Sequence, residues 1–165
     1  MSSSETSLRI VRADYADPVH GAAIIALLDE YAGGDSGGGE CLPDAVRTDL
    51  VPALARCANA LTLLAYADDT AVGILNAFES LSTFKARPLL NIHDIAVTHG
   101  WRRRGVGRAL LAEIERIALA RGCCKLTLEV LEGNASAQQL YRDIGFDAYT
   151  LQSDFGRALF WQKGL

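Results

Sequence analysis

The chain has 165 residues, which is enough for one domain that buries roughly two thirds of its unfolded surface. Half of the residues are apolar, 22% are charged, and the formal net charge is −4. This acidic balance argues against a general nucleic-acid binder, and no apolar run is long enough to cross a bilayer. We therefore expect a single domain over residues 1–165, with neither a nucleic-acid nor a membrane partner.

The N-terminus and the cysteines indicate where the protein works. Residues 1–7 are polar and lack the basic and hydrophobic parts of a secretory signal, so we expect a flexible tail and a cytoplasmic protein. The four cysteines form no Cys-x-x-Cys pair, and no histidine stands at zinc-finger spacing. We expect neither a bound metal nor a disulfide framework.

The first third of the chain predicts two helices. Asp17 is a suitable N-cap for a helix that starts at Pro18 and ends near Ala32. The glycine-rich stretch 33–40 predicts a flexible loop. A second helix should run from Pro43 or Asp44 towards Arg56, with a kink or restart at the internal Pro52.

Strand patterns fill most of the remaining chain. A hairpin turn is expected at Asp68 and Asp69, a helix over Gly105–Arg121, and a shorter helix from the cap Asn134 to Ile144. The expected strands are Leu8–Arg12, Ala60–Tyr66, Ala71–Ser80, Leu89–Val97, Lys125–Leu131, Phe146–Leu151 and Ala158–Lys163.

The stretch from Trp101 to Leu111 favours phosphate binding. Gly105 and Gly107 lack the Cβ atoms that would obstruct an anion, and the following helix offers amide N–H groups without internal partners. The positive end of the helix dipole favours a diphosphate at the same place. Four basic side chains add charge around it: Arg102, Arg103, Arg104 and Arg108.

Two motifs resemble the GNAT superfamily of N-acetyltransferases. The pattern Arg102-x-x-Gly105-x-Gly107 between a strand and a helix is similar to the family's acetyl-coenzyme A motif. Residues 134–146 resemble its Asn-x-x-Ala-x-x-x-Tyr-x-x-x-Gly-Phe segment. The resemblance implies an α/β fold whose mixed, mostly antiparallel central sheet has about seven strands. Helices should cover both faces, and the fourth and fifth strands should splay apart.

The same resemblance implies transfer of an acetyl group from acetyl-CoA to a primary amine, by direct attack in a ternary complex that releases CoA. The splayed strand should pair its free backbone groups with the pantetheine arm and the thioester oxygen, because unpaired main-chain groups are costly without a ligand. The implied cofactor-binding residues are Ile95, Ala96, Val97, Arg102, Arg103, Arg104, Gly105, Val106, Gly107, Arg108, Asn134, Ala137 and Tyr141.

Tyr141 is the candidate acid. It lies seven residues after Asn134, close to two helical turns, so both side chains should face the same side. A phenol with a pKa of about 10 is a reasonable donor to a thiolate whose conjugate acid titrates near roughly 8.5. The alternative interpretation is a helix cap followed by a half-buried tyrosine.

The base is sought on the strand that ends at Val97. Strict alternation places Asn91 and His93 on the face of Val97 and Asp94 on the opposite face. In the diamine acetyltransferase-like branch, the position four before the valine is glutamate, and here it is His93. Imidazole can accept an amine proton near neutral pH. His93 could instead be a core residue, and Glu79 is the second candidate base.

We expect the acceptor to be a small primary amine. Acidic residues gather near the glycine-rich loop, and two interpretations are open: they attract a cationic acceptor, or they form a solvated face. These residues are Asp29, Glu30, Asp35, Glu40 and Asp44. The alternatives are a protein or peptide amine as acceptor, and an acyl-CoA-binding module without turnover. A homodimer is expected through apolar residues of the last strands: Phe155, Leu159, Phe160 and Trp161.

Overall fold

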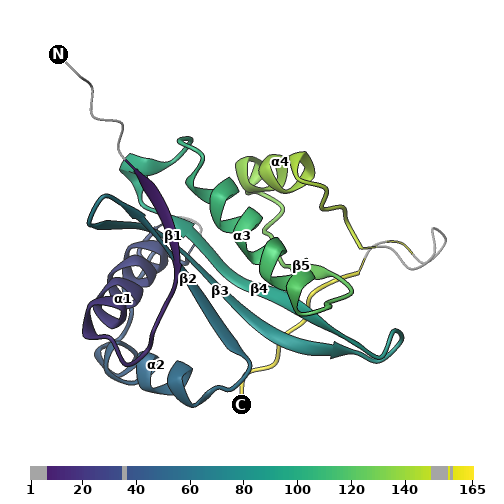
Figure 1. Cartoon of the computed structure of the whole chain (residues 1–165), viewed down its shortest axis with the longest axis horizontal. Helices are drawn as coiled ribbons and strands as arrows, with labels where there is room; N and C mark the ends of the chain where they lie inside the picture. The colour runs from purple at the N-terminus through teal and green to yellow at the C-terminus, as the bar shows by residue number, and fades with distance from the viewer. Residues whose placement is uncertain (1–6, 35–36, 150–155, 157) are drawn as a thin grey trace. The chain divides into compact units, whose positions relative to one another are not determined.

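The computed structural model describes residues 7–34, 37–149, 156 and 158–165. The chain groups into two compact units, Met1–Leu128 and Glu129–Leu165, each with its own elements (Figure 1). Among these described residues, no helix combines the length and apolar character needed to cross a membrane. The same residues contain no group of three His, Cys, Asp or Glu side chains that could hold a metal ion. That the two units act as one domain stays a prediction.

The first unit is built on a five-stranded sheet in the order β1-β2-β3-β4-β5. Neighbours from β1 to β4 are antiparallel, and β5 lies parallel to β4. The expected hairpin turn is confirmed, with Asp68 in the left-handed region at φ 50°. The strands are β1 (Leu8–Arg12), β2 (Ala60–Ala67), β3 (Thr70–Ser82), β4 (Arg87–Val97) and β5 (Leu126–Leu128).

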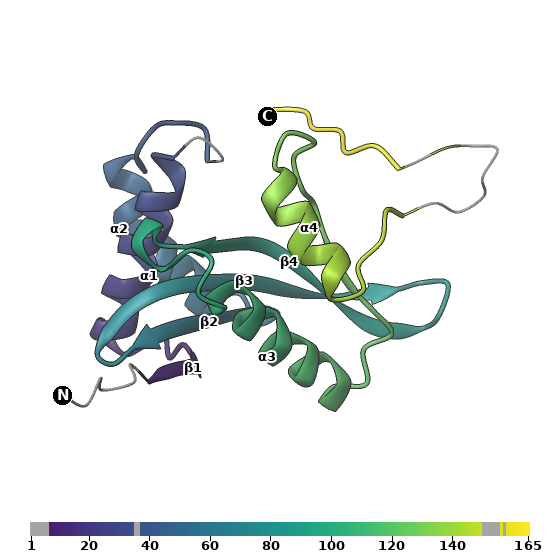
Figure 2. The ribbon, with the colours of Figure 1, turned by 90° about the horizontal axis from the view of Figure 1, so that it is seen from above.

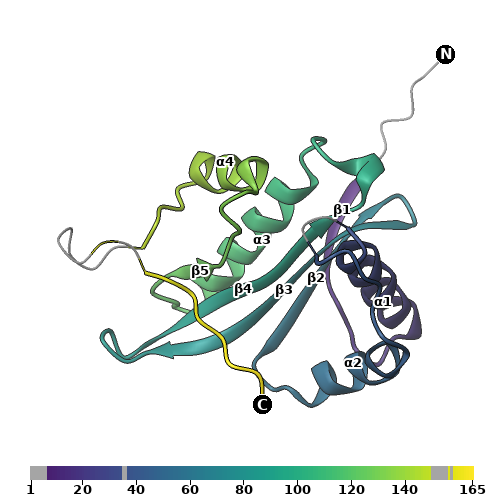
Figure 3. The same ribbon diagram turned by 180° about the vertical axis from the view of Figure 1, so that it is seen from behind.

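Helices cover both faces of this sheet. On one side lie α1 (Pro18–Ala32) and α2 (Asp44–Arg56), and on the other lies α3 (Val106–Ala120), as Figure 2 and the view from behind in Figure 3 show. Every residue of β2 is buried as a result. Asp17 caps α1 as expected, because its Oδ1 accepts a hydrogen bond of 2.8 Å from the Val19 amide. Pro52 lies within one uninterrupted helix and does not restart it.

A β-bulge interrupts the pairing of β3 with β4. Asn76 lies opposite Asp94, but the next residue, Ala77, lies opposite Ile92, so His93 is the extra residue of the bulge. An extra residue shifts the alternation of side chains along the strand. Beyond the bulge, β4 also loses its other neighbour, because pairing with β5 covers only residues 90–92. Within residues 7–128, the end of β4 therefore has one unpaired edge, which is the expected splay between the fourth and fifth strands.

The second unit contains α4 (Ala135–Asp143) followed by irregular chain. The Phe146 amide donates to the Tyr141 carbonyl at 2.9 Å and closes the helix end. The predicted strand 158–163 is wrong, because these residues are not paired in a β-ladder. The Ala158 amide makes a single backbone hydrogen bond, of 3.2 Å, to the Tyr149 carbonyl. Residues 146–149 are likewise not a strand, and 150 and 151 lie outside the described residues. The described chain thus has five strands instead of about seven.

The contact between β3 and α3 depends on Gly73. A Cβ at this position would lie 2.9 Å from Val106 Cγ1 and 3.3 Å from Leu110 Cδ1, both buried side chains. A methyl group here would push α3 away from the sheet.

We predict that Gly73→Ala lowers the free energy of unfolding by about 1–3 kcal/mol, as overpacked cores do. Urea unfolding followed by circular dichroism measures it. Gly100→Ala is the control, because a Cβ at Gly100 meets nothing within 4 Å. Equal stability of the two variants would show that α3 does not rest against Gly73.

Candidate functional site

The loop that precedes α3 is shaped to receive an anion. Arg103 and Gly105 have positive φ values of 60° and 85°, and Gly105 is the N-cap of α3 without a side-chain hydrogen bond to the helix. The first amides of a helix have no intrahelical acceptor, and they point along the positive end of the helix dipole. The start of α3 therefore offers backbone donors suited to phosphate oxygens.

The arginines predicted to bind the cofactor have different local roles. The Nε of Arg102 donates to the Val97 carbonyl at 3.2 Å, which ties the loop to the end of β4. The guanidinium of Arg104 lies over the Trp101 ring at 5.1 Å from its centroid. Arg103 and Arg108 are exposed. The loop thus combines a positive surface with a backbone fixed by its own side chains.

The end of β4 leads from this loop to a pocket. Val97 lies opposite Gly73 and so faces α3, whereas Ala96 packs with the core beneath α1. Ile95 shares the face of Val97. These three residues border the edge of β4 that is not paired with β5, and on that edge the Val97 carbonyl accepts the hydrogen bond from Arg102. An extended ligand could pair with backbone groups along such an edge.

A pocket of about 410 Å³ lies between α1, α2 and strands β3 and β4. Its walls are mostly apolar, and its polar side chains come from α1, β3 and β4. The apolar residues are Leu28, Ala32, Leu42, Val46, Leu50, Leu54 and Phe78. The polar residues are Tyr31, Asn76, His93 and Asp94.

His93 and Asp94 both line this pocket, so the prediction that they lie on opposite faces is wrong. The bulge at His93 is the reason, because it brings two successive side chains to the same side. The expectation that His93 shares the face of Val97 fails for the same reason. The His93 ring meets Phe78 edge-on, with 5.7 Å between the centroids. Asp94 is the pocket residue that sequence reasoning missed. Its signal in the sequence was the polar pair His93-Asp94 within an otherwise mostly apolar strand.

Asp94 ends a buried chain of hydrogen bonds. The Thr62 hydroxyl donates to Asn76 Oδ1 at 2.7 Å, and Asn76 Nδ2 donates to Asp94 Oδ2 at 3.0 Å. Thr62 and Asn76 are 1% and 3% exposed. Since the single hydroxyl proton of Thr62 is used on Asn76, the Tyr15 hydroxyl donates to Thr62 across 3.0 Å. Every donor in the chain therefore points towards Asp94, which suits an ionised carboxylate.

Tyr31 adds a further donor to the pocket. Burial, and secondly the negative charge of Asp94, raise the pKa of the Tyr31 phenol above its usual value. Its hydroxyl consequently keeps its proton at neutral pH.

Glu79 lies apart from these residues. Its Oε2 accepts a hydrogen bond of 2.8 Å from Arg121 Nη1, just beyond the end of α3, and it is not among the pocket residues. The structure brings His93 together with Asp94 and not with Glu79. A catalytic role of Glu79 stays a prediction.

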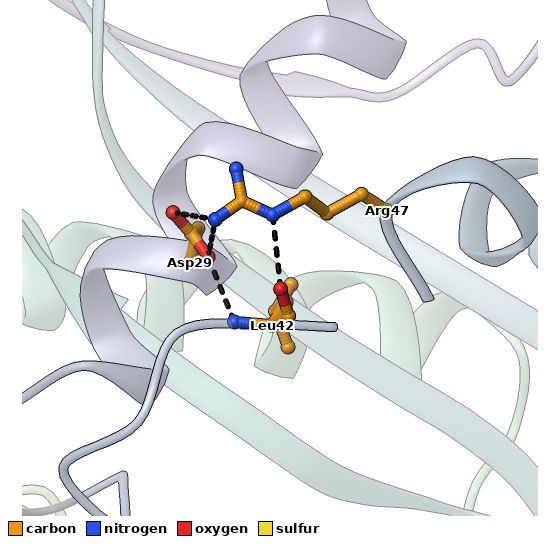
Figure 4. A network of polar contacts seen from close by, with 3 residues as sticks. All are labelled: Asp29, Leu42 and Arg47. Atoms are coloured by element: carbon orange, nitrogen blue, oxygen red, sulfur yellow. Dashed lines mark hydrogen bonds and ion pairs between the residues drawn. The ribbon is translucent and has the colours of Figure 1, made fainter. Parts of the chain in front are cut away.

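Two of the acidic residues near the glycine-rich loop, Asp29 and Glu30, hold the chain in place. Asp29 accepts two hydrogen bonds from Arg47 Nη2, at 2.8 and 2.9 Å, and one of 2.8 Å from the Leu42 amide (Figure 4). Glu30 Oε1 accepts from the His99 amide at 3.0 Å. Neither carboxylate lines the pocket of His93 and Asp94. Asp35 lies outside the described residues.

In the second unit, Asn134 and Tyr141 belong to α4 and its cap. The Asn134 side chain accepts from the Ala137 amide at 3.1 Å, which confirms the predicted cap. Tyr141 is 7% exposed, and its ring lies 5.9 Å from that of Phe146. Their contacts with a cofactor stay predictions.

Comparison with known proteins identifies related sequences. A sequence model described as Acetyltransferase (GNAT) family matches residues 25–146. Over 66 residues the chain is 36% identical to thialysine N-epsilon-acetyltransferase of Bos taurus, covering 40% of this chain and 38% of that protein. Over 74 residues it is 39% identical to streptothricin acetyltransferase of Streptomyces lavendulae, and this match covers 45% of this chain and 39% of that protein. Each of these matches spans less than half the length of the curated relative.

A solved structure shares the fold over nearly all of both chains. It is an aminoglycoside N-acetyltransferase in complex with CoA, with a TM-score of 0.76, 19% identity and 99% of each chain covered. At this identity the likeness concerns the fold.

Proposed function

The protein belongs to the acetyltransferase (GNAT) family, and we propose that it transfers an acetyl group from acetyl-CoA to the primary amine of a small molecule. One observation carries the proposal: β4 connects a pocket of about 410 Å³ to a helix start whose backbone donors suit an anion. Asp94 and His93 lie in the pocket, Ile95–Val97 follow, and the loop before α3 comes next. Since each strand residue advances the chain by about 3.3 Å, Asp94 and Val97 are separated by about 10 Å along β4.

The chain offers a fitting set of groups for acetyl-CoA, which supplies the activated acyl group when bound. Amides at the start of α3 and the arginines from Arg102 to Arg108 would hold the diphosphate. Backbone groups of Ile95, Ala96 and Val97 would pair with the pantetheine arm, and Asn134 and Ala137 would contribute from α4. These assignments fit the open edge of β4 and the uncapped helix start.

The pocket supplies the groups that an amine needs. Asp94 would attract and orient the ammonium ion, and His93 would accept one of its protons, because a protonated amine has no lone pair to attack with. The amine nitrogen then forms the bond to the thioester carbonyl carbon while the carbon–sulfur bond breaks. Tyr141 would give its hydroxyl proton to the departing sulfur. The nitrogen releases its second surplus proton to solvent, which in turn reprotonates Tyr141.

Two alternatives lead to different outcomes with a panel of acceptors. A protein or peptide acetyltransferase would prefer N-terminal or lysine amines of peptides, and a non-catalytic acyl-CoA-binding module would turn over none. The size of the pocket favours a small molecule over a peptide, and measured turnover separates an enzyme from a binding module.

We also propose that the protein forms a homodimer through its C-terminal residues. Leu159, Phe160 and Trp161 are successive apolar side chains that are 75%, 77% and 83% exposed, and Phe155 lies outside the described residues. Exposed apolar surface of this kind favours association. Sedimentation equilibrium distinguishes this dimer from a monomer.

The cofactor loop is tested with Gly107→Val. The branched side chain obstructs the first turn of α3, so the Kd for CoA should rise roughly tenfold or more, equal to about 1.4 kcal/mol. Isothermal titration calorimetry measures it. Ala112→Val, at an exposed position of the same helix, is the matched control and should bind CoA normally. Unchanged affinity in a folded Gly107→Val protein would refute the proposed diphosphate site.

The acid role is tested with Tyr141→Phe, which should lower kcat by roughly 10²–10⁴-fold while CoA affinity persists. Tyr149→Phe, at an exposed tyrosine of the same unit, should keep the wild-type rate. A Tyr141→Phe effect confined to KM would contradict proton donation to sulfur.

The base role is tested by pH profiles with one acceptor amine. A protonated imidazole cannot accept a proton, so kcat/KM should fall with decreasing pH, and His93→Ala should lose rate and flatten this acidic limb. Asp94→Asn should instead raise the KM for the amine and leave the limb in place. If His93→Ala keeps both the rate and the limb, the histidine only packs against Phe78.

A further inference from the structure

We propose that the acceptor is a primary monoamine whose body is apolar, either an alkyl chain or an aromatic group. This inference rests on the proposed function, and it names the substrate class that the pocket of about 410 Å³ selects. The relevant observation is the unequal distribution of polar groups. The single carboxylate is on the sheet side, and the side chains that α1 and α2 contribute are aliphatic except for Tyr31.

The helical walls of the pocket offer one polar side chain, that of Tyr31 on α1, and are otherwise aliphatic. Leu28 and Ala32 come from α1, and α2 contributes Val46, Leu50 and Leu54. Leu28 and Leu54 are 8% and 6% exposed and belong to the core beneath the sheet. A polar group placed against such side chains loses its hydration without gaining a hydrogen bond.

The charge in the pocket suits one cation. Asp94 is the single carboxylate among the lining residues, and the buried Asn76 fixes its orientation. A polycationic acceptor would bring further ammonium groups against the aliphatic walls, where the lining offers no second carboxylate. Asp29 and Glu30 do not compensate, since Arg47 and the His99 amide engage them outside this pocket.

The apolar wall near the glycine-rich loop is held in place. Asp29 binds the Leu42 amide, and Arg47 Nε donates to the Leu42 carbonyl at 3.0 Å, so both backbone groups of this residue are engaged (Figure 4). Asp29 and Arg47 are themselves joined at 2.8 Å. The ion pair therefore orders Leu42 as part of the lining and leaves its backbone unavailable to a peptide-like acceptor.

A peptide fits this pocket less well than a simple amine. Each peptide unit carries a donor and an acceptor that need partners when buried. Beyond Tyr31, Asn76, His93 and Asp94, the lining side chains named above supply none. The same argument disfavours a second amino group at the far end of the acceptor.

The test compares hexylamine with hexamethylenediamine, two acceptors that share a six-carbon chain and differ by one terminal ammonium group. With the wild-type protein and saturating acetyl-CoA, release of CoA thiol gives kcat/KM for each. We expect hexylamine to be preferred by roughly tenfold or more, because the second ammonium would lie against aliphatic side chains. Phenethylamine should rank with hexylamine.

A charge inserted into the wall should reverse this preference. Val46 lines the pocket and is 38% exposed, and it lies in the first turn of α2, where an acidic residue is well tolerated. We expect Val46→Asp to shift the ratio of the two kcat/KM values towards the diamine by roughly tenfold. Ala45→Asp adds the same charge one residue earlier, outside the lining, and should keep the wild-type ratio.

Each outcome of the panel has one meaning. Preference for the diamine, for an aminoglycoside or for a peptide N-terminus would overturn the monoamine assignment while leaving acetyl transfer intact. Absence of turnover with every amine would overturn the proposed function and this inference with it. An unchanged ratio in Val46→Asp would show that the acceptor body does not lie against α2.

Discussion

The candidate site depends on one irregularity, the bulge at His93 in β4. A regular strand would send His93 and Asp94 to opposite faces, but the extra residue brings both to the pocket beneath α1 and α2. Just beyond it, β4 loses its pairing with β5, so the backbone of Ile95–Val97 borders an open edge. The bulge thus accounts for the polar side of the pocket, and the end of the pairing with β5 accounts for the open edge beside it.

Buried hydrogen bonds fix the orientation of the Asp94 side chain. Its partner Asn76 is 3% exposed and bonded in turn to Thr62, so rotating either side chain would leave a buried polar group unsatisfied. On the helical side, the ion pair of Asp29 and Arg47 fixes Leu42 in the apolar lining. The pocket therefore has a rigid carboxylate opposite a rigid apolar wall, an arrangement that orients an amphipathic amine.

Local patterns in the sequence predicted the elements that local chemistry determines. The bounds of α1, the cap of α4 by Asn134 and the glycine at the start of α3 follow from N-cap preferences and helical spacing. The bulge was not predictable, since it depends on the register between β3 and β4, and so His93 was wrongly assigned to the face of Val97. The last strand was overpredicted because apolar content alone does not supply a pairing partner. Glu79 illustrates the same limit, as its pairing with Arg121 joins residues distant in the sequence.

The most direct test of the site is carboxyl ¹³C NMR of the CoA-saturated protein during titration with hexylamine. The Asp94 carboxyl resonance should shift and saturate with the amine, because the ammonium binds beside it, and the Glu79 resonance should remain in place. A saturable shift at Glu79 without one at Asp94 would contradict the placement of the acceptor at the bulge of β4.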